Sequence, residues 1–514
     1  MLSYHVVKRF DRAFAALIFL GFVLYFGLLS LREIWFADFA FYLSAVAALQ
    51  ANLLEPGHEM VAGVGLESAF LYSPYIFSIA LLGKALALSP FASLQLAAIL
   101  NLLLYVFAIA RFFRVFSVNQ SCWAAPALCL LASLLVRRFN FCWSSETSLL
   151  TFRWIQTYPS TFAWSVVILS LSEAELYLRH GRHRHLAIVG VGLWFLTISH
   201  MLSASWLVGL LVLRVMFRKV LPAEKDTGKS WAVIATIILA ILATSLWPYL
   251  SALKILTLAS HPENPPFGER VLEEVWYPFL LGLPALIYFF YCKQHRVLLL
   301  WFAGTWFAFL TSAALDLSFG NRFIFFQAFF LHVAIAEIIT LGLRTGMTQG
   351  LRKPDRPALA ITAVCIVGIL ASPQISEARE EGFGQLPSPF KLLTMPSNRE
   401  LFAKEWAPYR SFIGEGDIVM TPPDLSPAYL ATYTRSRSVV GIYAFPGSEA
   451  RVEAVELFFD PNAPWSAREE VLKRYGVTKV LVPIEQAEHA KDVQKHLGDA
   501  LFRGDRYLVF SAAN

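Results

Sequence analysis

The sequence predicts a multi-pass α-helical membrane protein with about 11–13 transmembrane helices and a small C-terminal α/β domain. Of the 514 residues, 57% are hydrophobic and only 16% are charged, whereas soluble proteins carry roughly 25% charged residues. Apolar stretches of roughly 20 residues recur between residues 13 and 373, and each is long enough to cross a bilayer as a helix. These stretches lack the alternation of membrane β-strands, so helices are expected.

The apolar runs define the expected membrane segments. The first, from Ala13 to Leu31, has no small-residue cleavage site, so we interpret it as a retained anchor and not a signal peptide. The others lie near residues 70–89, 91–110, 121–136, 161–177, 186–199, 201–217, 231–254, 276–292, 297–315, 322–343 and 358–373. The five cysteines lie in or near these runs without a C-x-x-C spacing, so neither a disulfide framework nor a metal centre is expected.

Basic residues set the expected orientation, because positively charged loops stay in the cytoplasm. Such residues precede the first run and fill the connections 179–185, 218–229, 292–296 and 344–356. The net charge of +6 is explained by this topology and does not indicate nucleic-acid binding. Loops 32–69, 137–160, 256–275 and 316–321 then face outward. Counted back from the C-terminus, inner and outer loops alternate correctly as far as residue 137. Before that residue the count is wrong by one crossing if every apolar run spans the membrane. Either 70–89 or one half of 186–217 is therefore expected to be re-entrant or broken.

The composition after residue 375 becomes that of a soluble domain. "DIVMTPP" (417–423), "VTKVLVP" (477–483) and "RYLVFSA" (506–512) read as strands, and "SAREEVLKRYG" (466–476) reads as a helix closed by Gly476. We therefore expect a membrane domain at 1–375, with a first outer loop at 32–69, and an extracytoplasmic α/β domain at 385–514. The latter has no nucleophile elbow, phosphate loop or metal cluster, so we expect it to shape the acceptor side.

The first outer loop contains the leading catalytic candidate. "ADFAFYLSAVAALQANLL" has apolar residues at helical spacing and little charge, which predicts an amphipathic helix in the membrane interface. Asp38 opens this segment. A carboxylate at the bilayer surface can act as a general base on a hydroxyl or amine. The structural alternative is that Asp38 simply stabilises a helix N-terminus.

The same segment carries a family resemblance. "FADFAFYLSAVAAL", followed by a loop that ends in "ESAFLYSPYIFSIALLGKAL", resembles the opening of the GT-C glycosyltransferases, among them the protein O-mannosyltransferases and the lipid A aminoarabinose transferases. The resemblance implies that Asp38 is the catalytic acid/base and that Tyr72 and Tyr75 belong to the substrate-binding region. The family motif usually has a second acid beside the aspartate, and here Phe39 stands in that position. The residues after 420 resemble extracytoplasmic domains of GT-C-like bacterial proteins.

Five further residues are candidates for substrate or phosphate binding. His200 interrupts an apolar stretch, where it needs a hydrogen-bond partner in a neighbouring helix or a cavity to line. Glu146 and Arg153 lie in an outward loop rich in aromatic residues, and both also suit an ordinary interfacial belt. Arg322 stands at the mouth of a phenylalanine-rich run, and its planar fork suits a lipid phosphate. It could instead snorkel or pair with Asp316. Arg270 is a second cation candidate in a proline-rich loop.

Together these features predict a glycosyltransferase of the inner (plasma) membrane. It would move a sugar from a polyprenyl-phosphate-linked donor to a lipid, glycan or protein acceptor on the outer face, in contact with membrane lipids and without a metal or another cofactor. One alternative is a transporter or flippase of lipid-linked or envelope polysaccharide intermediates, although such proteins usually show repeat symmetry and polar groups near the midplane. The other is a non-catalytic assembly protein that keeps the fold.

Overall fold

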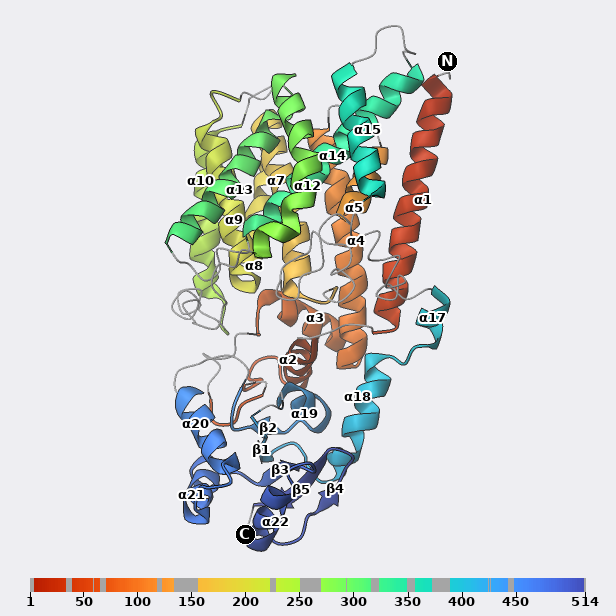
Figure 1. Cartoon of the computed structure of the whole chain (residues 1–514). Coiled ribbons are helices and arrows are strands. Elements are labelled where there is room, and N and C mark those ends of the chain that lie inside the picture. The colour runs from red at the N-terminus through yellow and green to blue at the C-terminus, as the bar shows by residue number, and fades with distance from the viewer. Residues whose placement is uncertain are drawn as a thin grey trace. The chain divides into compact units, whose positions relative to one another are not determined.

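The computed structural model describes residues 4–33, 39–58, 60–64, 71–117, 123–133, 156–221, 228–249, 270–292, 294–315, 323–348, 356–371, 389–423, 425, 427–441 and 448–512. The chain divides into two compact units. The first comprises Met1–Trp35, Ala97–Leu246 and Pro262–Met395, and the second comprises Phe36–Leu96, Trp247–His261 and Pro396–Asn514. Figure 1 labels their elements.

All described secondary-structure elements of the first unit are helices. Its elements are α1 (Tyr4–Leu31), α4 (Pro90–Phe116) from Ala97 onward, α5 (Ala124–Ala132), α7 (Pro159–His180), α8 (His183–Ser199), α9 (Met201–Met216), α10 (Ser230–Ala243), η3 (Thr244–Leu246), α12 (Arg270–Tyr291), α13 (Arg296–Ala314), α14 (Phe323–Thr348), α15 (Arg356–Leu370) and α17 (Pro389–Thr394). Within the described chain, five helices are long and apolar enough to cross a membrane: α1, α4, α7, α13 and α14. The predicted multi-pass helical membrane protein is confirmed.

Helix α14 is the centre of the first unit. Its apolar window is 89% buried, whereas that of α1 is 28% buried, so α14 is enclosed by protein and α1 lies at the periphery. α14 packs against α5, α12, α13 and α15. A Cβ added at Gly282 would lie 2.7 Å from the Cβ of Leu331, so α12 and α14 approach too closely there for a larger residue. Such small-residue contacts are the usual way in which membrane helices pack.

The segments that the sequence marked as re-entrant or broken are both short. α3 (Pro74–Ala85) has 12 residues, about 18 Å of helix, and a bilayer core is about 30 Å thick. The 186–217 stretch divides at His200 into α8 and α9, of 17 and 16 residues. The length of α3 therefore fits a re-entrant segment.

The second unit combines two short apolar helices with an α/β domain. Its elements are α2 (Phe39–Ala51), α3, the start of α4, α18 (Asn398–Trp406), η6 (Ala407–Ser411), β1 (Ile418–Met420), α19 (Pro427–Thr434), β2 (Arg437–Ser438), α20 (Ser448–Phe459), α21 (Trp465–Tyr475), β3 (Lys479–Pro483), α22 (Ala487–Leu497), β4 (Phe502–Arg503) and β5 (Tyr507–Ser511). The strand order is β2-β1-β3-β5-β4, and the β3–β5 and β4–β5 pairs are antiparallel. The predicted strands and the helix closed by Gly476, whose φ is 62°, are confirmed.

Both faces of this sheet are covered, because alternate residues of a strand point to opposite sides. Val480 and Val482 of β3 pack in one cluster with buried side chains of α20, α21 and α22. Leu481, between them, packs in a second cluster with Trp406 of α18 and Leu430 of α19. The domain is thus a three-layer α/β sandwich whose core is separate from that of the first unit.

The segment after α2 joins the edge of this sheet. Val61 forms a parallel bridge with Ser438 of β2, whose N–H donates to Met60 O at 2.7 Å and whose O accepts from Ala62 N at 3.0 Å. Arg451 of α20 donates from one guanidinium nitrogen to Ala62 O at 3.0 Å and to Val439 O at 2.9 Å. The first loop and the C-terminal domain therefore fold as one unit.

The expectation that α2 is amphipathic is wrong, whereas its predicted position in the membrane interface stays a prediction. The helix has no charged residue, and seven of its 13 residues are buried, among them Leu43, Val46 and Leu49. It packs against α3 and α19 within the second unit. An apolar surface on all sides is typical of an enclosed helix.

Candidate functional site

Half of the predicted site residues lie outside the described chain. Asp38, Glu146, Arg153 and Arg322 are in this group, and α12 begins at Arg270 but its side chain is not among those described. Their predicted roles stay predictions. The described residues that directly follow or precede them can be placed, and they show which helix ends meet.

Tyr72 and Tyr75 are both buried in the second unit, with 0% and 5% of their surface exposed. The Tyr72 hydroxyl donates to Gly57 O at 2.8 Å, and its ring packs edge-on against Tyr249. Trp247 donates from its indole N–H to Tyr72 O at 2.8 Å. Tyr72 therefore fixes the loop that follows α2.

His200 is the residue at which the chain passes from α8 to α9. Its φ of −158° and ψ of 80° are not helical, and its Nδ1 lies 2.8 Å from Ser203 Oγ in the first turn of α9. The side chain is half-buried. The histidine thus has a local hydrogen-bond partner at the start of α9.

An aromatic stack joins the beginnings of three helices of the first unit. The ring centroids of Trp164 and Trp206 are 5.2 Å apart, those of Trp164 and Phe326 are 5.3 Å apart, and those of Trp206 and Phe326 are 4.3 Å apart. The three planes lie within 16° of parallel. Trp164 is in α7, Trp206 in α9 and Phe326 in α14. Since His200 and Arg322 directly precede α9 and α14 in the sequence, the stack brings those two helix starts to one end of the unit.

Buried polar groups surround the beginning of α7. Gln156 is fully buried, its carbonyl accepts from Asn101 Nδ2 at 2.7 Å, and its side chain bonds Ser30 Oγ at the end of α1. Trp164 Nε1 and Ser160 Oγ are buried without a partner in the described chain. Gln327, which is 1% exposed, leaves both amide atoms unpartnered within the same described residues. Native proteins leave few such groups unsatisfied, so this end of the unit has donors and acceptors available to water or a ligand.

Comparisons with known proteins agree with this architecture. Neither a protein-family model nor a curated protein sequence matches the chain. Among solved structures, ArnT from Cupriavidus metallidurans bound to undecaprenyl phosphate matches with a TM-score of 0.55 at 12% identity, over 99% of both chains. The chain has the GT-C fold. The apo form of that ArnT matches with a TM-score of 0.56 at 12% identity, over 97% of this chain and 98% of that one.

A second match is to a larger GT-C protein. Arabinofuranosyltransferase AftD from Mycobacteria matches with a TM-score of 0.56 at 14% identity. The match covers 94% of this chain but 35% of the AftD chain. The fold expected from the resemblance of the first loop is thus confirmed.

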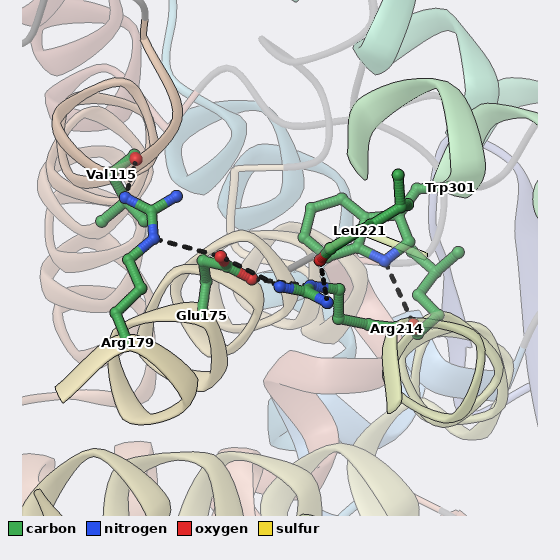
Figure 2. A network of polar contacts seen from close by, with 7 residues as sticks. Val115, Glu175, Arg179, Arg214, Leu221 and Trp301 are labelled. Carbon is green, nitrogen blue, oxygen red and sulfur yellow. Dashed lines mark hydrogen bonds and ion pairs between the residues drawn. The ribbon is translucent and has the colours of Figure 1, made fainter. Parts of the chain in front are cut away.

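Sequence reasoning missed a buried charge network at the other end of α7 (Figure 2). Glu175 of α7 and Arg214 of α9 are each 2% exposed and form an ion pair, in which Arg214 Nε lies 2.9 Å from Glu175 Oε2. Arg214 also donates to Leu221 O at 3.1 Å. Arg179 donates to Glu175 at 3.1 Å and to Val115 O at 2.8 Å (Figure 2). An arginine inside an apolar run, as at position 214, was the available signal.

A second ionic group lies nearby on α7. Glu173 accepts from Arg111 Nε at 2.8 Å and bonds His185 Nδ1 at 2.5 Å. Both networks join side chains of α4, α7, α8 and α9 to one another. Because their charges are paired inside the protein, we assign them to the stability of this helix group and not to substrate binding.

Proposed function

We propose that this protein is a glycosyltransferase that moves a sugar from a polyprenyl-phosphate-linked donor to an acceptor at the outer face of the inner membrane. The observation that carries the proposal is the full-length structural match to ArnT, a protein whose crystal structure contains undecaprenyl phosphate. The match includes the C-terminal domain and not only the membrane helices, since it covers 99% of each chain.

The donor phosphate is proposed to bind where α14 begins. Arg322 directly precedes this helix, and a guanidinium can hold two phosphate oxygens at once. Gln327 and Trp164 supply buried polar atoms that have no partner in the described chain. Arg270, at the start of α12, is proposed as a second cation for the phosphate. The phenylalanine-rich start of α14 is suited to the isoprenoid chain that follows the phosphate.

Asp38 is proposed as the general base. It takes the proton from the acceptor hydroxyl or amine as that group attacks the anomeric carbon of the sugar. The bond from the anomeric carbon to the phosphate oxygen breaks, and the lipid phosphate leaves with the bonding electrons. Arg322 stabilises the charge that develops on this oxygen. No metal enters this proposal.

The remaining candidates have supporting roles in the proposal. His200 and Glu146 orient the sugar by hydrogen bonds. Tyr72 and Tyr75 hold the loop after Asp38, which agrees with their burial and with the Tyr72–Gly57 hydrogen bond. The C-terminal domain is proposed to shape the binding of the acceptor, which is a lipid, glycan or protein.

Asp38→Asn tests the proposal, because asparagine keeps the shape of the side chain but cannot take a proton. Purified protein in lipid nanodiscs is supplied with a radiolabelled polyprenyl-phosphate sugar and a membrane extract as acceptor source. We expect transfer to fall by about 10²–10⁴-fold, the usual contribution of a general base. Asp505→Asn, at an exposed position of the C-terminal domain, is the matched control. Undiminished transfer by Asp38→Asn would show that the base is another residue.

A further inference from the structure

The second unit contains a cavity of about 490 Å³ that the proposed mechanism does not use. Its volume lies within the range of small-molecule sites. One wall comes from α2 and the loop after it, and the other comes from β1, the end of α19 and the start of β2. The lining residues used below are Ala48, Glu55, Glu415, Asp417, Arg435 and Arg437.

Small residues of α2 make the space. Ser44, Ala47, Ala48 and Ala51 line the cavity at positions i, i+3, i+4 and i+7 of the helix, which places them on one face. A larger side chain on this face would project into the volume. The face lies opposite charged residues of the α/β domain, so the cavity has a small-residue floor and polar walls.

Three of the charged groups in the lining are already engaged. The Asp417 carboxylate accepts from Gly414 N at 2.9 Å and from Thr478 Oγ1 at 2.7 Å. Glu415 pairs with Arg435 at 3.4 Å. The Glu415–Arg435 pair is close to neutral, whereas Asp417 keeps its negative charge because both of its donors are uncharged.

Glu55 and Arg437 are left with opposite charges and open hydrogen-bonding capacity. Within the described chain, neither side chain has a hydrogen bond or an ion pair. The Arg437 guanidinium lies over Gly57, where an added Cβ would be 2.5 Å from its Nη2. Gly57 has a φ of 65°, a backbone conformation that favours glycine. The cavity is thus lined by a hydrogen-bond donor, the Arg437 guanidinium, and by a hydrogen-bond acceptor, the Glu55 carboxylate.

The chemistry of the lining excludes several classes of ligand. A lipid chain would need large apolar side chains, and Ile418 is the one such residue in the lining. A free phosphate would meet the carboxylates of Glu55 and Asp417, and an amine would meet the Arg437 guanidinium. No group of three metal ligands exists among the described residues. A neutral molecule rich in hydroxyl groups satisfies both open charges, because each hydroxyl can donate to Glu55 and accept from Arg437.

We propose that this cavity binds a neutral sugar residue of the acceptor. The identification of that sugar as part of the acceptor depends on the proposed function, whereas the binding itself does not. The cavity lies in the unit that contains both the segment after Asp38 and the C-terminal domain. A sugar bound there would select acceptors that already carry a glycan.

Binding of methyl glycosides to the full-length protein in micelles tests the cavity without requiring transfer. Saturation-transfer NMR with methyl α-glucoside, methyl α-mannoside and methyl β-galactoside is expected to give a signal with at least one of them. Ala48→Phe fills the cavity and should abolish the signal. Glu55→Gln and Arg437→Gln each remove one charged hydrogen-bond partner and should weaken binding by about tenfold or more.

Matched controls are Glu453→Gln and Arg503→Gln, two exposed positions of the same unit outside the cavity, and both should bind as the native chain does. No signal with any glycoside, or equal binding by Glu55→Gln, Arg437→Gln and their controls, would overturn the inference. So would binding of the zwitterion glycine in place of the sugars. Sugar binding without any transfer by the native chain would instead refute the proposed function and leave the cavity assignment standing.

Discussion

The ion pair between Glu175 and Arg214 provides a quantitative prediction for the first unit. Arg214→Met removes the contact at 2.9 Å, a second contact at 3.3 Å and the hydrogen bond to Leu221. Among the described residues, Glu175, at 2% exposure, then has only Arg179 as a partner. Removing one member of a buried pair costs about 3–5 kcal/mol, because the remaining charge stays desolvated.

The control for this prediction is Arg179→Met. Arg179 is 27% exposed and contacts the same carboxylate, so the loss of this ion pair and of its hydrogen bond to Val115 O should cost less, about 1–2 kcal/mol. The double variant Glu175→Gln/Arg214→Met should be more stable than Arg214→Met alone, since no buried charge is left. Unfolding of the purified protein in mixed micelles, followed by tryptophan fluorescence as SDS is increased, measures the native protein, these three variants and Glu175→Gln alone. Equal destabilisation by Arg214→Met and Arg179→Met, or additive effects of the Glu175 and Arg214 changes within about 0.5 kcal/mol, would refute the reasoning.

Three further predictions concern other contacts. Arg451→Met removes two charged hydrogen bonds that hold the first loop to the sheet. The substitution should lower the free energy of unfolding by about 2–4 kcal/mol and speed proteolysis after residue 64. Unchanged cleavage would show that Arg451 does not hold the loop. Gly282→Ala should destabilise the first unit by about 1–3 kcal/mol through overpacking against Leu331, and a neutral or higher unfolding midpoint would contradict the close approach. Burial, followed by the nearby Arg468, lowers the pKa of His489 from its ordinary value of 6.5. Stability of the C-terminal domain in the full chain should therefore be complete above pH 6.5 and fall, by at most about 1.4 kcal/mol per pH unit, as pH drops toward the folded pKa. In limited proteolysis, His489→Gln should flatten the dependence of stability on pH. A pH profile unchanged by this substitution would contradict the role of His489.

Much of the architecture could be predicted from hydrophobic patterning. The apolar runs predicted α1, α7 and α14 because membrane helices must be apolar over their full length. The strands at 417–423, 477–483 and 506–512 were predicted because β-branched and apolar residues gather between turn signals. The break at His200 could also be predicted, since a lone polar residue interrupts an apolar stretch.

Tertiary contacts account for what could not be predicted. The pairing of Val61 with Ser438 joins residues far apart in the sequence through one bridge, and such a short pairing leaves no periodic pattern. α2 has the composition of either an exposed or an enclosed helix, and only its packing against α3 and α19 decides between them. Glu175 and Arg214 are 39 residues apart on different helices. For the candidate site, the sequence indicated the helix starts but not the stack of Trp164, Trp206 and Phe326 that joins them.

The most direct test of the account is the fate of the donor lipid. Native protein and Asp38→Asn are incubated with a polyprenyl-phosphate sugar labelled in both the lipid and the sugar, together with the acceptor extract. The account predicts that the native protein releases one polyprenyl monophosphate for each sugar transferred, and that Asp38→Asn releases almost none. Movement of the intact, doubly labelled lipid across the bilayer without release of polyprenyl phosphate would contradict the account and identify a transporter.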